Sequence, residues 1–456
     1  MSKERNIFLF GAGAVIDWGA PKTICDGSKL TRLPERNSEK IGNRICCLTH
    51  LIRETGFQCK SGERISNKIY EILKNNGVSE KEINFETIIN VIEELIAYYS
   101  NFDEETKSSL IACFIEPSEV MKDILNFEIE GGIAKHGYKL IIPNYPDIDK
   151  RSYKNERPEQ FFLQQLIANL LDGIIGHISK YSYYTNGNPT VIENAINKSL
   201  NDGFYNWIKN ISGEDGIIRM YTLNYDRLFK VILENRGLEV FEGFECGASS
   251  NPGDEIQPNV KRILSDFDST VYYNLHGSAY WDVSARNNYQ LPASEFYLRG
   301  VPNFSSNLWE QPTRQMDKGK TIMLTNIITG YQKTSKTAVT PFKQMLSAFD
   351  RDCVFADRLF IAGYGFGDEH INESIKTALI HNPKIKITII DPAFIKNKFD
   401  EKLGIGLFSN SQLNLTPKKV SDNLYSYLES RVEVYTHYFK DVFSINLKSA
   451  KQKQMV

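Results

Sequence analysis

The feature that most constrains this chain is a series of short apolar runs, each ending in glycine, asparagine, aspartate or proline. Most are apolar nearly throughout rather than alternating, which is typical of central strands covered on both faces. Helical patterns lie between several of them, so the sequence predicts an α/β fold with a mostly parallel, doubly wound sheet. The predicted strands are Asn6–Phe10, Ile217–Leu223, Thr270–Leu275, Thr321–Thr325, Leu359–Gly363, Ile385–Ile390 and Val432–Tyr438.

A long stretch with helical character separates the first two predicted strands. Asn84–Ser100 and Phe161–Ile178 carry apolar residues at spacings of three and four, the period of an amphipathic helix. We therefore predict a large helical insertion after the first βα unit of a Rossmann-like sheet domain. The expected boundaries are 1–35 and 213–445 for the sheet domain, 36–212 for the insertion and 446–456 for a tail.

Charge and cysteine usage exclude several classes of protein. The net charge is −2 and the sequence pI is about 6.4, which gives no general reason to bind nucleic acid. The seven cysteines are odd in number and contain no CxxC pair, so no zinc ribbon and no metal site are expected. We find no signal-peptide pattern and no uncharged apolar stretch of about 18 residues, and we expect a cytoplasmic protein without a membrane span.

A glycine turn directly follows the first predicted strand. The segment FLFGAGAVIDWGAP places Gly11, Ala12 and Gly13 where backbone N–H groups can approach a pyrophosphate at a helix N-terminus. The third glycine of the usual dinucleotide fingerprint is missing, since position 16 is Ile. A glycine turn with only a packing role stays open as the alternative.

Two further strands end in polar side chains. Asn224 and Asp226 leave the strand YTL together, and an Asn at this place can bind ribose hydroxyls or a water. An Asx turn that ends the strand is the alternative. His276 and Gly277 follow the run YYNL, where the ring would point toward a ligand crevice, although a lone histidine is often structural.

A second glycine loop, GYGFGDEHIN, follows the predicted strand at 359–363. Its alternating glycines indicate another close backbone approach, and Asp368 could bind a ligand or cap the next helix. Asp391, at the end of the following strand, could meet an adenosine or cap a turn. Because parallel strands bring their carboxyl ends to one edge of a sheet, these segments predict a single site.

Read in order, the four segments GAGAV, TLNYD, LHGS and GYGFGDEHIN resemble the motifs of the sirtuin family, and more closely its divergent bacterial branch in anti-phage defence. The resemblance covers about residues 5–33 and 215–392. Three departures stand out: Val15 replaces the usual Ser or Thr, the four-cysteine zinc module of deacylases is absent, and so is their Pro-Asp-Phe-Arg-like stretch.

The resemblance implies NAD⁺ as substrate and a role for each motif. Asn224 would hold the nicotinamide ribose or the attacking water, Asp226 would support the nicotinamide end, and His276 would act on the ribose hydroxyls or as general base. The glycine turns would line the phosphates and the adenosine. The candidate NAD contacts are Gly11, Ala12, Gly13, Val15, Asp17, Gly277, Gly363, Gly365, Phe366, Asp368, His370, Asn372 and Asp391.

Hydrolysis of NAD⁺ is the function we predict, because nicotinamide leaves as a neutral molecule and needs no general acid. An unperturbed histidine, with a pKa near 6.5, can act as the base near neutrality. An NAD- or ADP-ribose-binding scaffold without turnover and an NAD-dependent protein deacylase are the alternatives. The defence branch further implies a homo-oligomer and a separately encoded HerA-type ATPase or translocase as partner.

Overall fold

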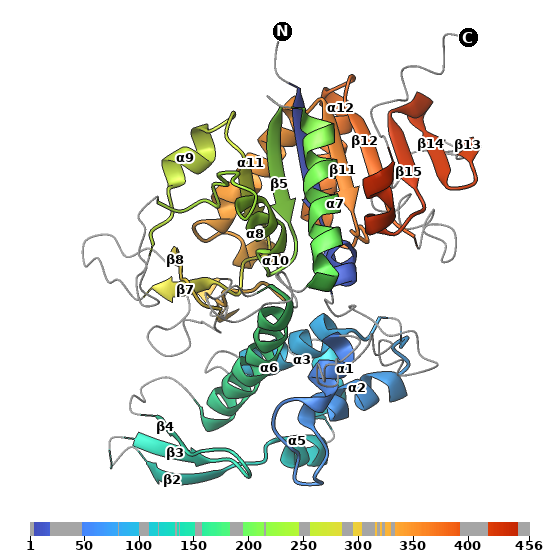
Figure 1. The fold of residues 1–456 in the computed structure, drawn as a ribbon. Coiled ribbons are helices and arrows are strands. Elements are labelled where there is room, and N and C mark those ends of the chain that lie inside the picture. Colours follow the sequence, from blue (N-terminus) through green and yellow to red (C-terminus); the bar gives the residue numbers. More distant parts are fainter. Residues whose placement is uncertain are drawn as a thin grey trace, which may run out of the picture.

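The computed structural model describes residues 4–18, 48–80, 82–99, 109–116, 118–132, 135, 137–150, 157–182, 195–213, 216–245, 256–284, 295–302, 315–316, 320–321, 324–329, 333–392 and 418–445. A central sheet fills the upper part of Figure 1. Of the segment between its strands β1 (Arg5–Phe10) and β5 (Ile217–Thr222), the described residues from 48 to 182 lie below it.

The other strands of the central sheet are β6 (Val271–Asn274), β11 (Arg358–Ala362), β12 (Lys386–Ile390), β13 (Lys418–Ser421), β14 (Leu424–Tyr427) and β15 (Val432–Tyr435). They are arranged in the order β13-β14-β15-β12-β11-β1-β5-β6. All neighbours from β15 to β6 are parallel, whereas β13 and β14 form an antiparallel hairpin at one edge. The chain extends the sheet in both directions from β1, so the predicted doubly wound α/β class is confirmed.

Helices cover both faces of this sheet, which explains why its strands are apolar throughout (Figure 1). On one face the rings of Phe8 and Trp207 lie 5.6 Å apart, and on the other Tyr221 packs 4.9 Å from Phe349. The helical elements of this part are η1 (Ala12–Trp18), α7 (Ala195–Ser212), α8 (Leu228–Glu234), α9 (Val260–Ser265), α10 (Lys333–Lys336), α11 (Phe342–Phe355), α12 (Glu369–His381), η3 (Leu428–Ser430) and η4 (Phe439–Ser444).

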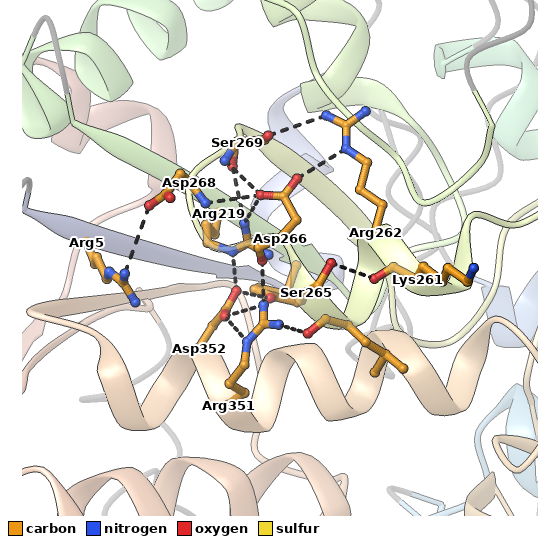
Figure 2. A network of polar contacts seen from close by, with 12 residues as sticks. Arg5, Arg219, Lys261, Arg262, Ser265, Asp266, Asp268, Ser269, Arg351 and Asp352 are labelled. Atoms are coloured by element: carbon orange, nitrogen blue, oxygen red, sulfur yellow. Dashed lines mark hydrogen bonds and ion pairs between the residues drawn. The ribbon is translucent and has the colours of Figure 1, made fainter.

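A buried ionic network fastens α11 to β5 (Figure 2). The guanidinium of Arg219 donates to the carboxylate of Asp352, which also lies 2.7 Å from Arg351. Asp266 is 3.6 Å from Arg219 and accepts from the backbone N–H of Ser269. Since breaking one partner of such a buried pair leaves an uncompensated charge, this network holds the helix in one register on the sheet.

We predicted Thr321–Thr325 as a strand of the central sheet, and this prediction is wrong. Lys320–Thr321 (β10) pairs instead with Gln315–Met316 (β9) in a separate two-stranded ladder. The chain just beyond runs beside the segment that follows β6, because Asn326 accepts from the Ser278 N–H and donates its amide to the Ser278 carbonyl. Strands β7 (Trp281–Ser284) and β8 (Glu295–Leu298) form another hairpin.

The segment below the sheet is helical, as predicted, but it also contains a three-stranded antiparallel sheet. Its two predicted helices are confirmed as α3 and α6, which pack against each other. Helix α7, expected to belong to the insertion, packs on β1 and η4, and the domain boundaries themselves stay a prediction. The elements are α1 (Leu48–Glu54), α2 (Ile65–Asn75), α3 (Phe85–Tyr98), α4 (Ser109–Ile115), α5 (Ser118–Ile124), β2 (Glu128–Gly132), β3 (Gly137–Ile141), β4 (Ile148–Lys150) and α6 (Pro158–Ser182).

Helix α6 has, over Pro158–Ile178, the length and apolar composition of a helix that could cross a membrane. However, 67% of that window is buried inside the protein, and the helix packs on α1 and α3. This is the environment of a core helix.

Candidate functional site

The predicted site segments all follow strands whose carboxyl ends face the inserted segment, the part formed by α1 to α6 and β2 to β4 (Figure 1). Strands β11, β1, β5 and β6 are consecutive neighbours in the sheet and run parallel. The loops after them therefore share one edge, as the sequence predicted.

The turn at Gly11 and Gly13 lies in direct contact with the second glycine loop. The N–H groups of Gly11 and Gly13 donate to the carbonyls of Ala362 and Gly363, each at 2.9 Å. A Cβ on Gly13 would lie 2.7 Å from the Cα of Gly363. These two N–H groups therefore already have hydrogen-bond partners within the protein, and a packing role explains both glycines. Ala12, which lies between them, is exposed.

Val15 and Asp17 have structural partners that the sequence did not predict. Val15 is buried in the core behind the turn. The carboxylate of Asp17 lies 3.1 Å from the ammonium of Lys440 on η4. The ion pair ties the turn to the C-terminal part of the sheet domain, so both side chains are explained without a ligand.

Asn224 joins the ends of three strands. Its amide donates to the Gly11 carbonyl at 3.2 Å, which connects β5 to β1. Its own carbonyl accepts from the amide of Asn274 at the end of β6, at 2.9 Å. The side chain is 7% exposed, so in this state it faces the protein and must exchange the Gly11 contact to reach a ligand.

Asp226 has a structural contact at the end of β5. The residue is fully buried, and its carboxylate accepts from the N–H of Leu228 at 2.9 Å, just where α8 begins. This is the Asx turn that the sequence left open. Asp226 therefore shapes the exit from β5, and its role at the nicotinamide end stays a prediction.

His276 is buried at the end of β6 with an unsatisfied ring nitrogen. Its Nε2 has no hydrogen-bond partner in the described structure and lies 3.9 Å from a carboxylate oxygen of Asp368. The ring of His370, whose Nε2 is also unsatisfied, is 5.5 Å away between centroids. Gly277 follows with φ +86°, and a Cβ there would lie 2.2 Å from the Asn326 carbonyl oxygen. The backbone conformation and the close approach of Asn326 therefore explain this glycine.

Burial lowers the pKa of His276 to about 3, and the positive charge of Lys333 and the neighbouring His370 act in the same direction. Asp368 opposes them but is too weak to restore the usual value. His276 is therefore neutral at pH 7. The expectation of a base with an unperturbed pKa near 6.5 is wrong, because the sequence does not reveal how completely the ring is buried.

This pKa predicts a loss of stability in acid. Between pH 6.5 and 3 the unfolded chain binds a proton at His276 that the folded chain excludes, so stability falls as the pH falls. Relative to His276→Gln, the wild type should lose about 2 kcal/mol of unfolding free energy between pH 7 and pH 5. Denaturant unfolding of both proteins at the two pH values measures this, and parallel pH dependence would contradict the burial of an uncharged ring.

The second glycine loop is braced by two buried side chains. The Tyr364 hydroxyl donates to the side-chain oxygen of Asn372 at 2.9 Å, and the Asn372 amide donates to the Phe366 carbonyl at 3.0 Å. Asn372 is thus a structural residue of the loop. Gly365 and Gly367 differ from Gly363, because both are exposed and a Cβ on either would meet nothing within 4 Å.

Asp368 does not cap α12 with its side chain. Its carboxylate instead accepts from the ammonium of Lys333 at 2.8 Å, and the same ammonium lies 2.9 Å from Glu86 on α3. Burial opposes ionisation of Asp368, but the ammonium of Lys333 outweighs it and holds the pKa of Asp368 below the usual value. The last predicted contact, Asp391, follows β12. Its backbone N–H donates to the Tyr435 carbonyl at 3.0 Å.

Sequence reasoning missed Lys333 and Glu86 altogether. Neither lies in a motif, and Glu86 looks like an ordinary acidic residue in the first turn of a helix. Asn274 was passed over as part of a strand. Within the described ranges, no group of three or more His, Cys, Asp or Glu could hold a metal ion.

Similar solved structures are Sir2 homologues of low identity. A mutant Sir2 homologue in complex with ADP-ribose is 14% identical over 42% of this chain, with a TM-score of 0.22, and this chain spans only 54% of its length. A complex of mutant Sir2 homologues with 2′-O-acetyl ADP-ribose is 11% identical over 100% of this chain and 95% of the other, with a TM-score of 0.33. A Sir2 homologue–NAD complex is 14% identical over 52% and 67% of the two chains, with a TM-score of 0.25. These scores are low, and no argument rests on them.

A search of the curated proteins found no match. Among protein families, residues 219–406 match the model described as SIR2-like domain. The match includes Asn224, His276 and the second glycine loop and begins after the first glycine turn. This part of the chain is therefore similar to SIR2-like domains.

Proposed function

We propose that this protein is an NAD⁺ hydrolase that releases nicotinamide and ADP-ribose. The SIR2-like match over residues 219–406 supports an NAD-using function of the sirtuin kind. The observation that carries the hydrolytic reaction is His276, a neutral imidazole with an unsatisfied Nε2 at the same sheet edge as Asn224.

The reaction requires few groups from the protein. Water adds to C1′ of the ribose while the bond to nicotinamide breaks, and the bonding electron pair stays on the nicotinamide nitrogen. The proton of the water passes to Nε2 of His276. Positive charge develops on the ribose as the bond to nicotinamide breaks, and an imidazolium already present before the step would repel it. The low pKa of His276 keeps the ring neutral until then, in the form that can accept the proton of the water.

Asn224 has the second role, which is to hold the water or a ribose hydroxyl. Its amide now bonds the Gly11 carbonyl and would turn to the ligand. Asn224→Ala should therefore slow nicotinamide release by about 10–100-fold through lost positioning. Chromatography of nicotinamide and ADP-ribose measures the reaction, with Asn76→Ala, an exposed residue after α2, as the matched control. Equal rates for the two variants would remove Asn224 from the mechanism.

A binding scaffold without turnover is the second candidate, and the low basicity of His276 is the observation that favours it. Calorimetric titration with NAD⁺ separates the two functions: binding without nicotinamide release identifies the scaffold. The anti-phage role, the homo-oligomer, the HerA-type partner and the cytoplasmic location stay predictions.

A further inference from the structure

One carboxylate oxygen of Asp368 lies near two nitrogens that can carry a positive charge. The ammonium of Lys333 binds this oxygen at 2.8 Å, whereas the Nε2 of His276 is 3.9 Å from it, too far for a hydrogen bond. All three side chains are largely buried, with exposures of 16% for Asp368, 17% for Lys333 and 4% for His276. Lys333 and His276 therefore compete for one carboxylate, and Lys333 holds it.

The inserted segment determines where Lys333 lies. Glu86 of α3 binds the same ammonium of Lys333 at 2.9 Å. Two turns further along α3, Glu93 pairs with Lys336, which also donates to the Thr329 carbonyl at 2.7 Å. Two ion pairs thus connect the short helix α10 to α3. The Glu86–Lys333 pair also includes Asp368 of the site, whereas the Glu93–Lys336 pair does not.

We propose that Lys333 is a positioning residue that keeps the Asp368 carboxylate off His276, so that Nε2 of His276 stays free for the ligand. Without Lys333, Asp368 would turn to His276, form an ion pair with the ring and occupy Nε2. The inserted segment takes part through Glu86, which orients Lys333. This inference deepens the proposed function and rests on it for the identity of the ligand.

The titration of His276 tests the proposal without any turnover. The groups that face its ring are Asp368 and His370 from the start of α12 and Lys333 from α10. In full-length protein with ¹⁵N-labelled histidine, the His276 signal is assigned from its absence in His276→Gln. Lys333→Met should raise the pKa of His276 by about 2 units, into the range above about pH 5, because a repelling cation is lost and an ion pair is gained.

The double variant Lys333→Met/Asp368→Asn separates an ion pair from a loosened fold. The rise should vanish in it, because the amide cannot pair with an imidazolium. Lys336→Met, which breaks the neighbouring ion pair to α3 but does not touch Asp368, should leave His276 neutral. The proposal is overturned if Lys333→Met causes no rise, if the rise persists in the double variant, or if Lys336→Met produces it as well.

Activity supplies the second readout. Lys333→Met should slow nicotinamide release by about 10–100-fold, and the added Asp368→Asn substitution should restore part of that loss. If the titrations behave as expected but the wild type releases no nicotinamide, the proposed hydrolase function fails and the role of Lys333 stands. If nicotinamide is released and the titrations do not behave so, the role of Lys333 fails alone.

Discussion

Replacing His276 with alanine is expected to slow nicotinamide release from NAD⁺ by about 10²–10⁴-fold, the usual contribution of a general base. None of the residues that the structure describes is bonded to the ring nitrogen that would take the proton. ADP-ribose affinity should change little, since alanine removes a polar group whose main role lies in the transition state. Single-turnover assays together with calorimetry distinguish these two effects.

His381→Ala is the matched control, because His381 lies at the exposed end of α12, on the same helix as His370. It should keep the wild-type rate. If His276→Ala also kept that rate, water would be activated elsewhere, and the unsatisfied nitrogen would have no catalytic meaning. If His381→Ala lost activity to the same extent, the loss in His276→Ala could not be assigned to a missing base.

Replacing Gly363 with alanine is expected to cost about 2–5 kcal/mol of unfolding free energy, from left-handed backbone strain and from overpacking. Gly363 has φ +63°, and a Cβ there would lie 2.1 Å from the backbone nitrogen of Ala14 and 2.4 Å from the carbonyl carbon of Gly13. Backbone atoms cannot move aside as a flexible side chain can. Thermal unfolding followed by circular dichroism measures the loss.

Gly365→Ala is the comparison for this prediction, because its Cβ would meet open space and no positive φ is imposed there. Its unfolding midpoint should match that of the wild type. If Gly365 faces the NAD⁺ phosphates or adenosine, the same variant should nevertheless bind NAD⁺ more weakly. Equal stability of Gly363→Ala and Gly365→Ala would show that the two glycine turns do not touch.

The core of the fold was predictable because its strands are continuous apolar runs. Residues such as Phe8 and Tyr221 must be buried wherever the strand is placed, and parallel pairing follows from the helices between strands. The hairpin β13–β14 was missed because Lys418–Ser421 is fully exposed and carries no apolar pattern. The prediction for Thr321–Thr325 was wrong because an apolar run does not by itself distinguish a strand of the central sheet from a short separate ladder such as β9–β10.

Only those features of the site that depend on the sequence order of strands and loops could be predicted. Asn224 and His276 follow strands, so their shared edge could be inferred from the topology. For Asp226 the sequence could not distinguish an Asx turn from a ligand contact, because both require the same residue type. The Glu86–Lys333–Asp368 contact joins three distant parts of the chain, and the pKa of His276 depends on what surrounds it. Both arise from tertiary packing, which no motif encodes.

Strand β1 pairs on one side with β5, which begins at residue 217, and on the other with β11, which begins at residue 358. During synthesis the four apolar residues from Ile7 to Phe10 therefore emerge long before β5, and β11 follows later still. Pairings this distant in sequence form slowly and leave aggregation-prone surface exposed in the meantime. We therefore expect β1 to be a segment at which the nascent chain can aggregate until both neighbouring strands have been synthesised.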